Sequence, residues 1–204
     1  MSIVFVRHGE TALNAARVLQ PADTPLNSLG MAQADSVARR LARLGPAGIV
    51  SSDLPRAWVT AQVIGDACGR AVTPLTLLHE RNFGELRGRP YDTLGFDPLA
   101  SACAPPGGES NQAFMDRVAR AYDAIIRMRA AVQGPLVVVS HGMVIRMLLE
   151  RHCALPAGTE FPHRLGNTCV SVVSARPPHA VHLLGCTRHL DDADADDAQS
   201  LSGG

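Results

Sequence analysis

The sequence predicts an α/β fold: a three-layer α/β/α sandwich with a mostly parallel central sheet of about six strands and an irregular lid insertion. Short apolar runs alternate along the chain with helical patterns, which is typical of a parallel sheet covered on both faces. The chain has 204 residues, is 46% hydrophobic and carries 19 basic and 19 acidic residues. These figures fit one globular domain with a sizeable core, and they exclude disorder of the whole chain.

Six apolar runs bounded by turn or polar residues are the candidate strands. In chain order they cover residues 3–6, 49–50, 71–73, 136–140, 169–174 and 181–184. Helices are predicted where apolar residues recur at steps of three and four, over residues 34–44 and 114–132. Asn27 is the expected N-cap of the first helix, and Gly134-Pro135 is expected to stop the second before the next strand.

Two segments depart from this alternation. Residues 78–110 are rich in glycine and proline, and we expect them to form an irregular insertion that covers one end of the sheet. Residues 191–204 hold five aspartates and no apolar periodicity, which predicts an acidic, disordered tail. A single domain is therefore expected over residues 1–190.

Composition also limits the partners and the compartment. A net charge of zero argues against a general nucleic-acid or membrane-surface binder, since both need a basic face. No apolar stretch is long enough to span a bilayer, and the N-terminus lacks the pattern of a signal peptide, so we expect a cytoplasmic protein. The five cysteines are scattered without a C-x-x-C spacing, which indicates neither a disulfide framework nor a zinc site.

Histidines stand where two of the predicted strands end. Arg7-His8-Gly9 follows the first strand, and Ser140-His141-Gly142 follows the fourth. Arg56 comes shortly after the second strand, in Ser51-Ser52-Asp53-Leu54-Pro55-Arg56. Ligands of open α/β sheets bind outside the carboxyl ends of the strands. Arg7, His8, Arg56 and His141 are therefore expected at one sheet edge, in a cationic pocket suited to phosphate.

Further motifs extend this pattern over most of the chain. In order they are Arg7-His8-Gly9-Glu10-Thr11 with Asn14, Pro25-Leu26, Gly30-x-x-Gln33-Ala34, Ser51-Ser52-Asp53-x-x-Arg56-Ala57-x-x-Thr60-Ala61, Glu80-Arg81-Asn82-Phe83-Gly84, Pro106-Gly107-Gly108-Glu109-Ser110, Val139-Ser140-His141-Gly142 and Gly166-Asn167. With these blocks the chain resembles the histidine phosphatase superfamily, also called the phosphoglycerate mutase-like family. The resemblance covers roughly residues 3–174.

The resemblance implies a role for each matching residue. His8 is the expected nucleophile that accepts the phosphoryl group, and Glu80 is the expected proton donor. The phosphoryl oxygens are expected to be held by Arg7, Arg56 and His141, with Asn14 and the backbone of Gly142 as further phosphate contacts. Nearby positive charge favours the neutral, nucleophilic histidine and stabilises the charge of the transferred phosphoryl group. Neither a metal nor another cofactor is therefore expected.

Other assignments remain open at this stage. Glu85 stands in the same irregular segment as Glu80 and is the alternative proton donor. The stretch from Gln20 to Asp23 departs from the family pattern close to the expected substrate, so both residues are candidate substrate contacts. The insertion reads Leu86-Arg87 where many family phosphatases have an aromatic and an acidic residue. We hypothesise that Arg81, Arg87 or Arg89 meets a second anionic group on the substrate.

The expected activity is hydrolysis of a small-molecule phosphomonoester through a phosphohistidine intermediate. A cofactor-dependent phosphoglycerate mutase shares the catalytic residues, but Gly84 to Pro105 spans only 105 − 84 = 21 positions, and a short lid admits water. A non-catalytic phosphate sensor and a metal-binding protein are further alternatives. Arg7 and Arg56 argue against the latter because they would repel a cation. The pattern leaves a homodimer open.

Overall fold

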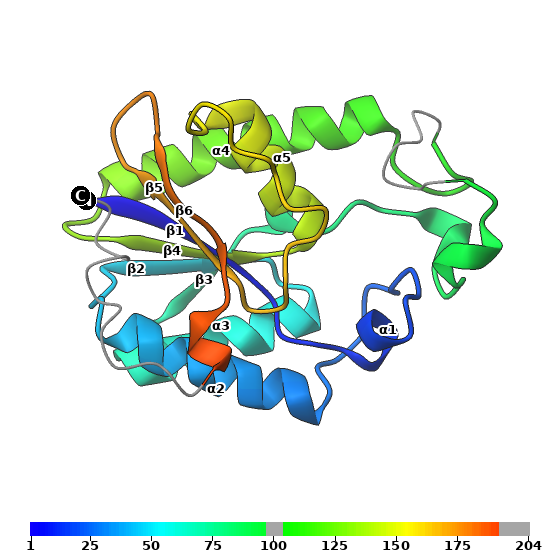
Figure 1. The fold of residues 1–204 in the computed structure, drawn as a ribbon, viewed down its shortest axis with the longest axis horizontal. Helices are drawn as coiled ribbons and strands as arrows, with labels where there is room; N and C mark the ends of the chain where they lie inside the picture. Colours follow the sequence, from blue (N-terminus) through cyan, green and yellow to red (C-terminus); the bar gives the residue numbers. More distant parts are fainter. Residues whose placement is uncertain (97–103, 192–204) are drawn as a thin grey trace.

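The computed structural model describes residues 1–96 and 104–191 of the chain. These residues form a six-stranded sheet with the strand order β3-β2-β4-β1-β5-β6 (Figure 1). The strands are β1 (Ser2–Arg7), β2 (Gly48–Ser51), β3 (Val72–Pro74), β4 (Leu136–Ser140), β5 (Val170–Ser174) and β6 (Val181–Cys186). The α-helices are α1 (Ala12–Ala15), α2 (Ser28–Ala42), α3 (Pro55–Cys68), α4 (Asn111–Ala130) and α5 (Gly142–His152). Except for Asp191, the predicted acidic tail lies outside the described residues.

The sheet is mostly parallel, as the sequence predicts. β1 pairs in parallel with β4, and β2 pairs in parallel with both β4 and β3. β5 is antiparallel to its neighbours β1 and β6. Within the register of β1 and β4, Arg7 lies opposite Ser140. The residues that follow these two, His8 and His141, therefore leave the sheet side by side.

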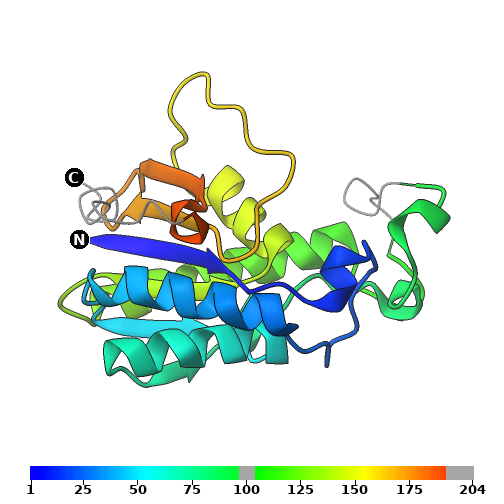
Figure 2. The same cartoon turned by 60° about the horizontal axis from the view of Figure 1, so that its bottom comes forward.

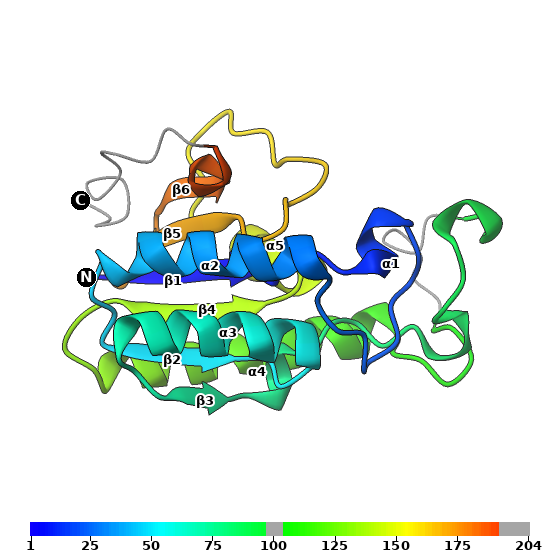
Figure 3. The same cartoon turned by 90° about the horizontal axis from the view of Figure 1, so that it is seen from below.

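Alternation along the strands divides the core into two layers. Ile3 and Phe5 of β1 belong to a cluster that contains Phe114 of α4 and Leu148 of α5. A second cluster lies on the opposite face of the sheet and contains Val4 and Val6 of β1, Val37 of α2 and Ala61 of α3. Figure 3 shows α2 and α3 in front of the sheet and α4 behind it. The predicted three-layer sandwich is thus confirmed.

Several helix boundaries differ from the expected ones. Asn27 caps α2 as predicted, since its side chain accepts from the backbone N–H of Gly30 at 2.7 Å. The fourth helix ends at Ala130, before Gly134-Pro135, so these residues do not stop it directly. The first helix, α1, has only four residues, and Arg17 follows it with a φ of 56°. That left-handed conformation takes the chain out of the helix.

The described part of the insertion has two arms, residues 78–96 and 104–110, which are joined by backbone hydrogen bonds at their base. Its described residues contain the short 3-10 helices η2 (Gly84–Leu86) and η3 (Tyr91–Thr93). Glu109 N–H donates to Asn82 O at 2.7 Å, and Glu85 N–H donates to Pro106 O at 3.0 Å. A Cβ on Gly84 would lie 2.0 Å from Pro106 O, so this close approach requires glycine. Figure 2 shows the insertion and α1 beyond the same end of the sheet.

Candidate active site

Two buried histidines stand at the ends of neighbouring parallel strands. Their ring centroids are 5.2 Å apart, and His8 and His141 are 2% and 0% exposed. Arg7 is the last residue of β1, and Arg56 is the second residue of α3, which follows β2. The topology therefore brings the four residues predicted from the strand ends to one place.

The ring of His8 is held in one tautomer. Its Nδ1 lies 2.7 Å from the carbonyl oxygen of Gly9, and because a carbonyl only accepts, Nδ1 carries the proton and Nε2 carries the lone pair. Burial lowers the pKa of His8 well below 6.5, and the charges of Arg7 and Arg56 lower it further. His8 is therefore neutral near pH 7 and presents Nε2 as a nucleophile.

His141 presents the opposite ring nitrogen. Its Nε2 lies 2.8 Å from Ser52 Oγ, whereas its buried Nδ1 has no hydrogen-bond partner among the described residues. When the Ser52 hydroxyl donates to Nε2, the proton of the neutral ring is on Nδ1. Burial lowers the pKa of His141 well below 6.5, with Arg56 as the next cause. His141 can thus donate a neutral hydrogen bond to a ligand.

Both arginines are tethered to backbone carbonyls and keep an unused donor. Arg7 Nη1 donates to Leu165 O, and Arg56 Nη1 donates to Pro21 O and Ala22 O at 3.3 Å each. The Nε atoms of both arginines are buried without a hydrogen-bond partner in the described chain. Burial lowers the pKa of Arg56 to about 10, so its guanidinium is still charged at neutral pH.

Glu80 reaches the same cluster from the start of the insertion. Its carboxylate accepts from Arg81 N–H at 2.9 Å and from Met143 N–H, in the first turn of α5, at 3.2 Å. Burial raises the pKa of Glu80 above 4.5, against the lowering effect of these two hydrogen bonds and of the arginines. Glu85 is exposed on η2 instead. The geometry thus favours Glu80 over Glu85 as the carboxyl group of the site.

The glycines that follow the two histidines have different surroundings. Gly142 begins α5, and a Cβ there would lie 3.5 Å from Arg7 Nε, so the N-terminus of this helix lies against Arg7. A Cβ on Gly9 would lie 2.4 Å from the carbonyl oxygen of Gly30. Gly9 therefore permits close packing of this turn on α2.

Asn14 lies in α1 and faces the loop before β5. Its Oδ1 accepts from Asn167 Nδ2 at 3.2 Å, and Asn167 Nδ2 also donates to the backbone carbonyl of His8 at 3.1 Å. With its oxygen used in this way, the amide nitrogen of Asn14 is the atom suited to contact an anion. Asn14 is thus tied to the backbone of His8 through one side chain.

The residues predicted to contact the substrate differ in their surroundings and exposure. Gln20 accepts from Thr11 Oγ1 at 2.9 Å. Arg87 is half-buried and lowers the pKa of Arg56 through its charge, so it lies near the cluster. Arg81 is only 2% exposed, packs over the ring of Phe83 and donates to Glu109 O. This placement favours a structural part for Arg81, and Arg89 is exposed.

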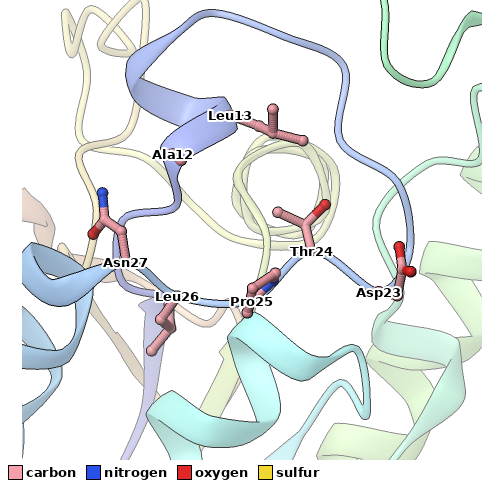
Figure 4. A pocket seen from close by; sticks show the side chains of 7 residues that line it. All are labelled: Ala12, Leu13, Asp23, Thr24, Pro25, Leu26 and Asn27. Carbon is pink, nitrogen blue, oxygen red and sulfur yellow. The ribbon is translucent and has the colours of Figure 1, made fainter.

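Asp23 lines a separate hollow beside α1. The hollow measures about 310 Å³, and Figure 4 shows its lining of Ala12, Leu13, Asp23, Thr24, Pro25, Leu26 and Asn27. None of the four residues from the strand ends is part of this lining. We place the candidate active site at the buried histidines and arginines, because the unused donors and the carboxyl group lie there.

Sequence reasoning missed two residues near Arg7. Arg164, in the loop before β5, lowers the pKa of Arg7, and Tyr91, in η3, acts on the pKa of both Arg7 and Arg56. Both lie in irregular segments. No periodicity or motif could have indicated that these segments approach the strand ends.

Within residues 1–96 and 104–191, histidine, cysteine, aspartate and glutamate side chains form no group of three or more placed to hold a metal ion. In the same residues no helix is long and apolar enough to cross a bilayer.

The structure is an α/β protein with a cluster of buried histidines and arginines at the carboxyl ends of parallel strands, and known proteins match it. The model of the histidine phosphatase superfamily (branch 1) matches residues 3–184. A probable phosphoglycerate mutase of Yersinia pestis, GpmB, is 35% identical and covers 98% of this chain and 99% of its own. The chain belongs to the histidine phosphatase superfamily, and it is an enzyme of the histidine-phosphatase type.

Solved structures agree with this family. A mycobacterial glucosyl-3-phosphoglycerate phosphatase, in complex with VO3, is 30% identical with a TM-score of 0.72 and covers 85% of this chain and 90% of that one. The alpha-ribazole phosphatase of Shigella flexneri is 25% identical with a TM-score of 0.78, and the two chains are covered to 92% and 97%.

Proposed function

We propose that the protein is a metal-independent phosphomonoester hydrolase that acts through a phosphohistidine intermediate on His8. One observation carries the proposal. Arg7 Nε, Arg56 Nε and His141 Nδ1 are buried nitrogens without a partner in the described chain. The charges of Arg7 and Arg56 act on the neutral His8, whose ring centroid lies 5.2 Å from that of His141. A buried donor without a partner costs about 1–3 kcal/mol. An anion with several oxygens, such as a phosphoryl group, would satisfy all three.

The first half-reaction transfers the phosphoryl group to the enzyme. The Nε2 lone pair of His8 attacks phosphorus, the bond to the ester oxygen breaks, and its electron pair stays on that oxygen. Glu80, whose protonated form is favoured because burial raises its pKa, gives its proton to the leaving oxygen. The positive charges of Arg7 and Arg56 stabilise the equatorial oxygens during transfer.

The second half-reaction returns the free enzyme. Glu80, now a carboxylate, takes a proton from water while the water oxygen attacks phosphorus. The nitrogen–phosphorus bond breaks, His8 recovers its lone pair, and phosphate leaves. Because Arg7 and Arg56 supply the positive charge throughout, no metal ion is required, and the activity should persist in chelator.

The substrate we propose is a small phosphomonoester with a second anionic group. The half-buried Arg87 lowers the pKa of Arg56 through its charge, which supports additional positive charge beside the proposed phosphate site. The structural neighbours named above act on small phosphorylated molecules. Replacing Arg87 by alanine should lower kcat/KM for a phosphorylated carboxylic acid more than for a neutral phosphorylated alcohol.

Phosphoglycerate mutase activity is the second candidate, and the 35% identity to a probable phosphoglycerate mutase favours it. The same His8 and Glu80 would serve a return transfer to a bound acceptor instead of to water. Interconversion of phosphoglycerates that depends on a bisphosphoglycerate primer would select this activity over hydrolysis.

The test is turnover of an aryl phosphate and a panel of small phosphomonoesters in chelator. The wild type should release phosphate, and His8→Ala should release none above background. His182→Ala, which changes an exposed histidine of β6, is the matched control and should keep wild-type rates. An active His8→Ala variant, or an activity that the chelator removes, would contradict the mechanism.

A further inference from the structure

Arg117 of α4 lies outside the cluster of histidines and arginines, yet it binds the backbone of Glu80 and of the residues just before it. Its Nη1 donates to the carbonyl oxygens of Leu77 and His79 at 2.8 and 2.7 Å. Its Nη2 lies 3.5 Å from the carbonyl oxygen of Glu80 itself. One guanidinium thus holds three carbonyls of the segment that carries the proposed acid.

A carboxylate fixes this guanidinium from the other side. Glu109 accepts from Arg117 Nε and Nη2, both at 2.8 Å, in a bidentate ion pair. The two side chains are each only 14% exposed. Burial alone would raise the pKa of Glu109, but the hydrogen bonds and charge of Arg117, together with Asn82 N–H and the charge of Arg81, outweigh it and lower the pKa. A bidentate, largely buried pair has a defined geometry.

Glu109 extends the clamp to the residues that follow Glu80. Its carboxylate accepts from Asn82 N–H at 3.3 Å, and its carbonyl oxygen accepts from Arg81 Nε at 3.3 Å. On the opposite side, Ser140 Oγ donates to Leu78 O at 2.8 Å. The backbone around Glu80 is therefore fixed between α4 and the end of β4.

We propose that Arg117 and Glu109 are positioning residues that aim the carboxyl group of Glu80 at the leaving oxygen. Proton transfer needs the donor within hydrogen-bond distance of the acceptor, and small displacements of a catalytic group reduce the rate strongly. The clamp does not touch the phosphoryl group, whose contacts come from Arg7, Arg56 and His141. Its loss should therefore impair proton donation selectively. The proposal rests on Glu80 as the acid.

A series of substituted phenyl phosphates separates a loss of proton donation from a general loss of phosphoryl transfer. Because kcat/KM reports the steps up to departure of the leaving group, its dependence on leaving-group basicity measures proton donation. The wild type should show a shallow dependence, and Glu80→Gln a steep one. Arg117→Ala should also show a steep dependence. Its kcat/KM should fall by on the order of ten- to a hundredfold for the most basic leaving group and should change little for the least basic one.

Two milder variants and one control protect the test against loss of folding. Glu109→Gln and Arg117→Lys keep most of the volume and should give intermediate slopes. Arg120→Ala removes an exposed arginine from the same helix and should keep the wild-type slope. The positioning role would be overturned if kcat/KM fell equally for all leaving groups in the Arg117 and Glu109 variants while Glu80→Gln still showed a steep dependence on leaving-group basicity. A shallow dependence in Glu80→Gln would instead overturn the role of Glu80 as the acid.

Discussion

At the scale of single residues, the chemistry depends on two histidines kept neutral for different purposes. Gly9 O fixes the proton of His8 on Nδ1, so that Nε2 keeps the lone pair that attacks in the proposed mechanism. Ser52 lies against Nε2 of His141, so that Nδ1 is the atom that remains without a partner in the described chain. Similar burial thus leaves a lone pair available in one ring and an N–H donor in the other.

This neutrality has a consequence for stability. Burial lowers the pKa of His8 and His141 well below 6.5. Below about pH 6.5 the unfolded chain binds protons that the folded chain does not, so both groups reduce the free energy of unfolding as the pH falls. At pH 5 the loss is at most about 2 kcal/mol for each histidine. Above pH 6.5 both are neutral in either state and the effect is absent.

Denaturant unfolding at pH 8 and pH 5 measures the effect. The double variant His8→Gln/His141→Gln should lose less stability than the wild type between these values, while His182→Gln should behave like the wild type. The raised pKa of Glu80 acts in the opposite direction but is common to all three proteins. Equal losses in the double variant and the wild type would show that the histidines are not held neutral.

At the scale of elements, the C-terminal 3-10 helix η4 (Arg188–Leu190) is anchored to α2 and to the loop before β5. His189 is 3% exposed; its Nδ1 lies 3.2 Å from Arg40 Nη1 of α2, and its Nε2 lies 3.0 Å from Thr168 Oγ1. Thr168 N–H in turn donates to the carbonyl oxygen of His8. A chain of contacts therefore connects α2 and η4 to the backbone of the nucleophile.

Replacing His189 by alanine should lower the free energy of unfolding by about 1–3 kcal/mol, because it leaves buried polar partners unsatisfied. Chemical denaturation of the variant beside His182→Ala, whose exposed side chain should matter by less than about 0.5 kcal/mol, measures the difference. If the two variants were equally stable, the contacts of His189 would contribute nothing to the fold.

At the scale of the whole molecule, the sheet topology decides which residues could be predicted. His8, His141 and Arg56 follow parallel strands of one sheet. The ends of such strands meet at one edge, so the sequence was sufficient to predict that these residues lie together. Arg164 and Tyr91 lie in irregular segments whose paths depend on long-range packing. The clamp of Arg117 and Glu109 depends on two arms of the insertion meeting at their base, which no local pattern encodes.

The charge distribution follows the same logic. The chain has no net charge, yet Arg7, Arg56 and Arg87 come together beside the two histidines, with Glu80 as the carboxyl group that reaches them. Composition could therefore argue against a general polyanion binder without revealing a local anion site. Only the positions of the arginines relative to the strand ends indicated it.

The central claim is that His8 itself carries the phosphoryl group during turnover. Rapid mixing with an aryl phosphate followed by an alkaline quench preserves phosphohistidine, and peptide mass spectrometry then locates the added phosphate. We predict a phosphoryl group on His8 that is lost on acid treatment and is absent from His8→Ala. Turnover by the wild type without any such adduct, or with the adduct on another residue, would contradict the account.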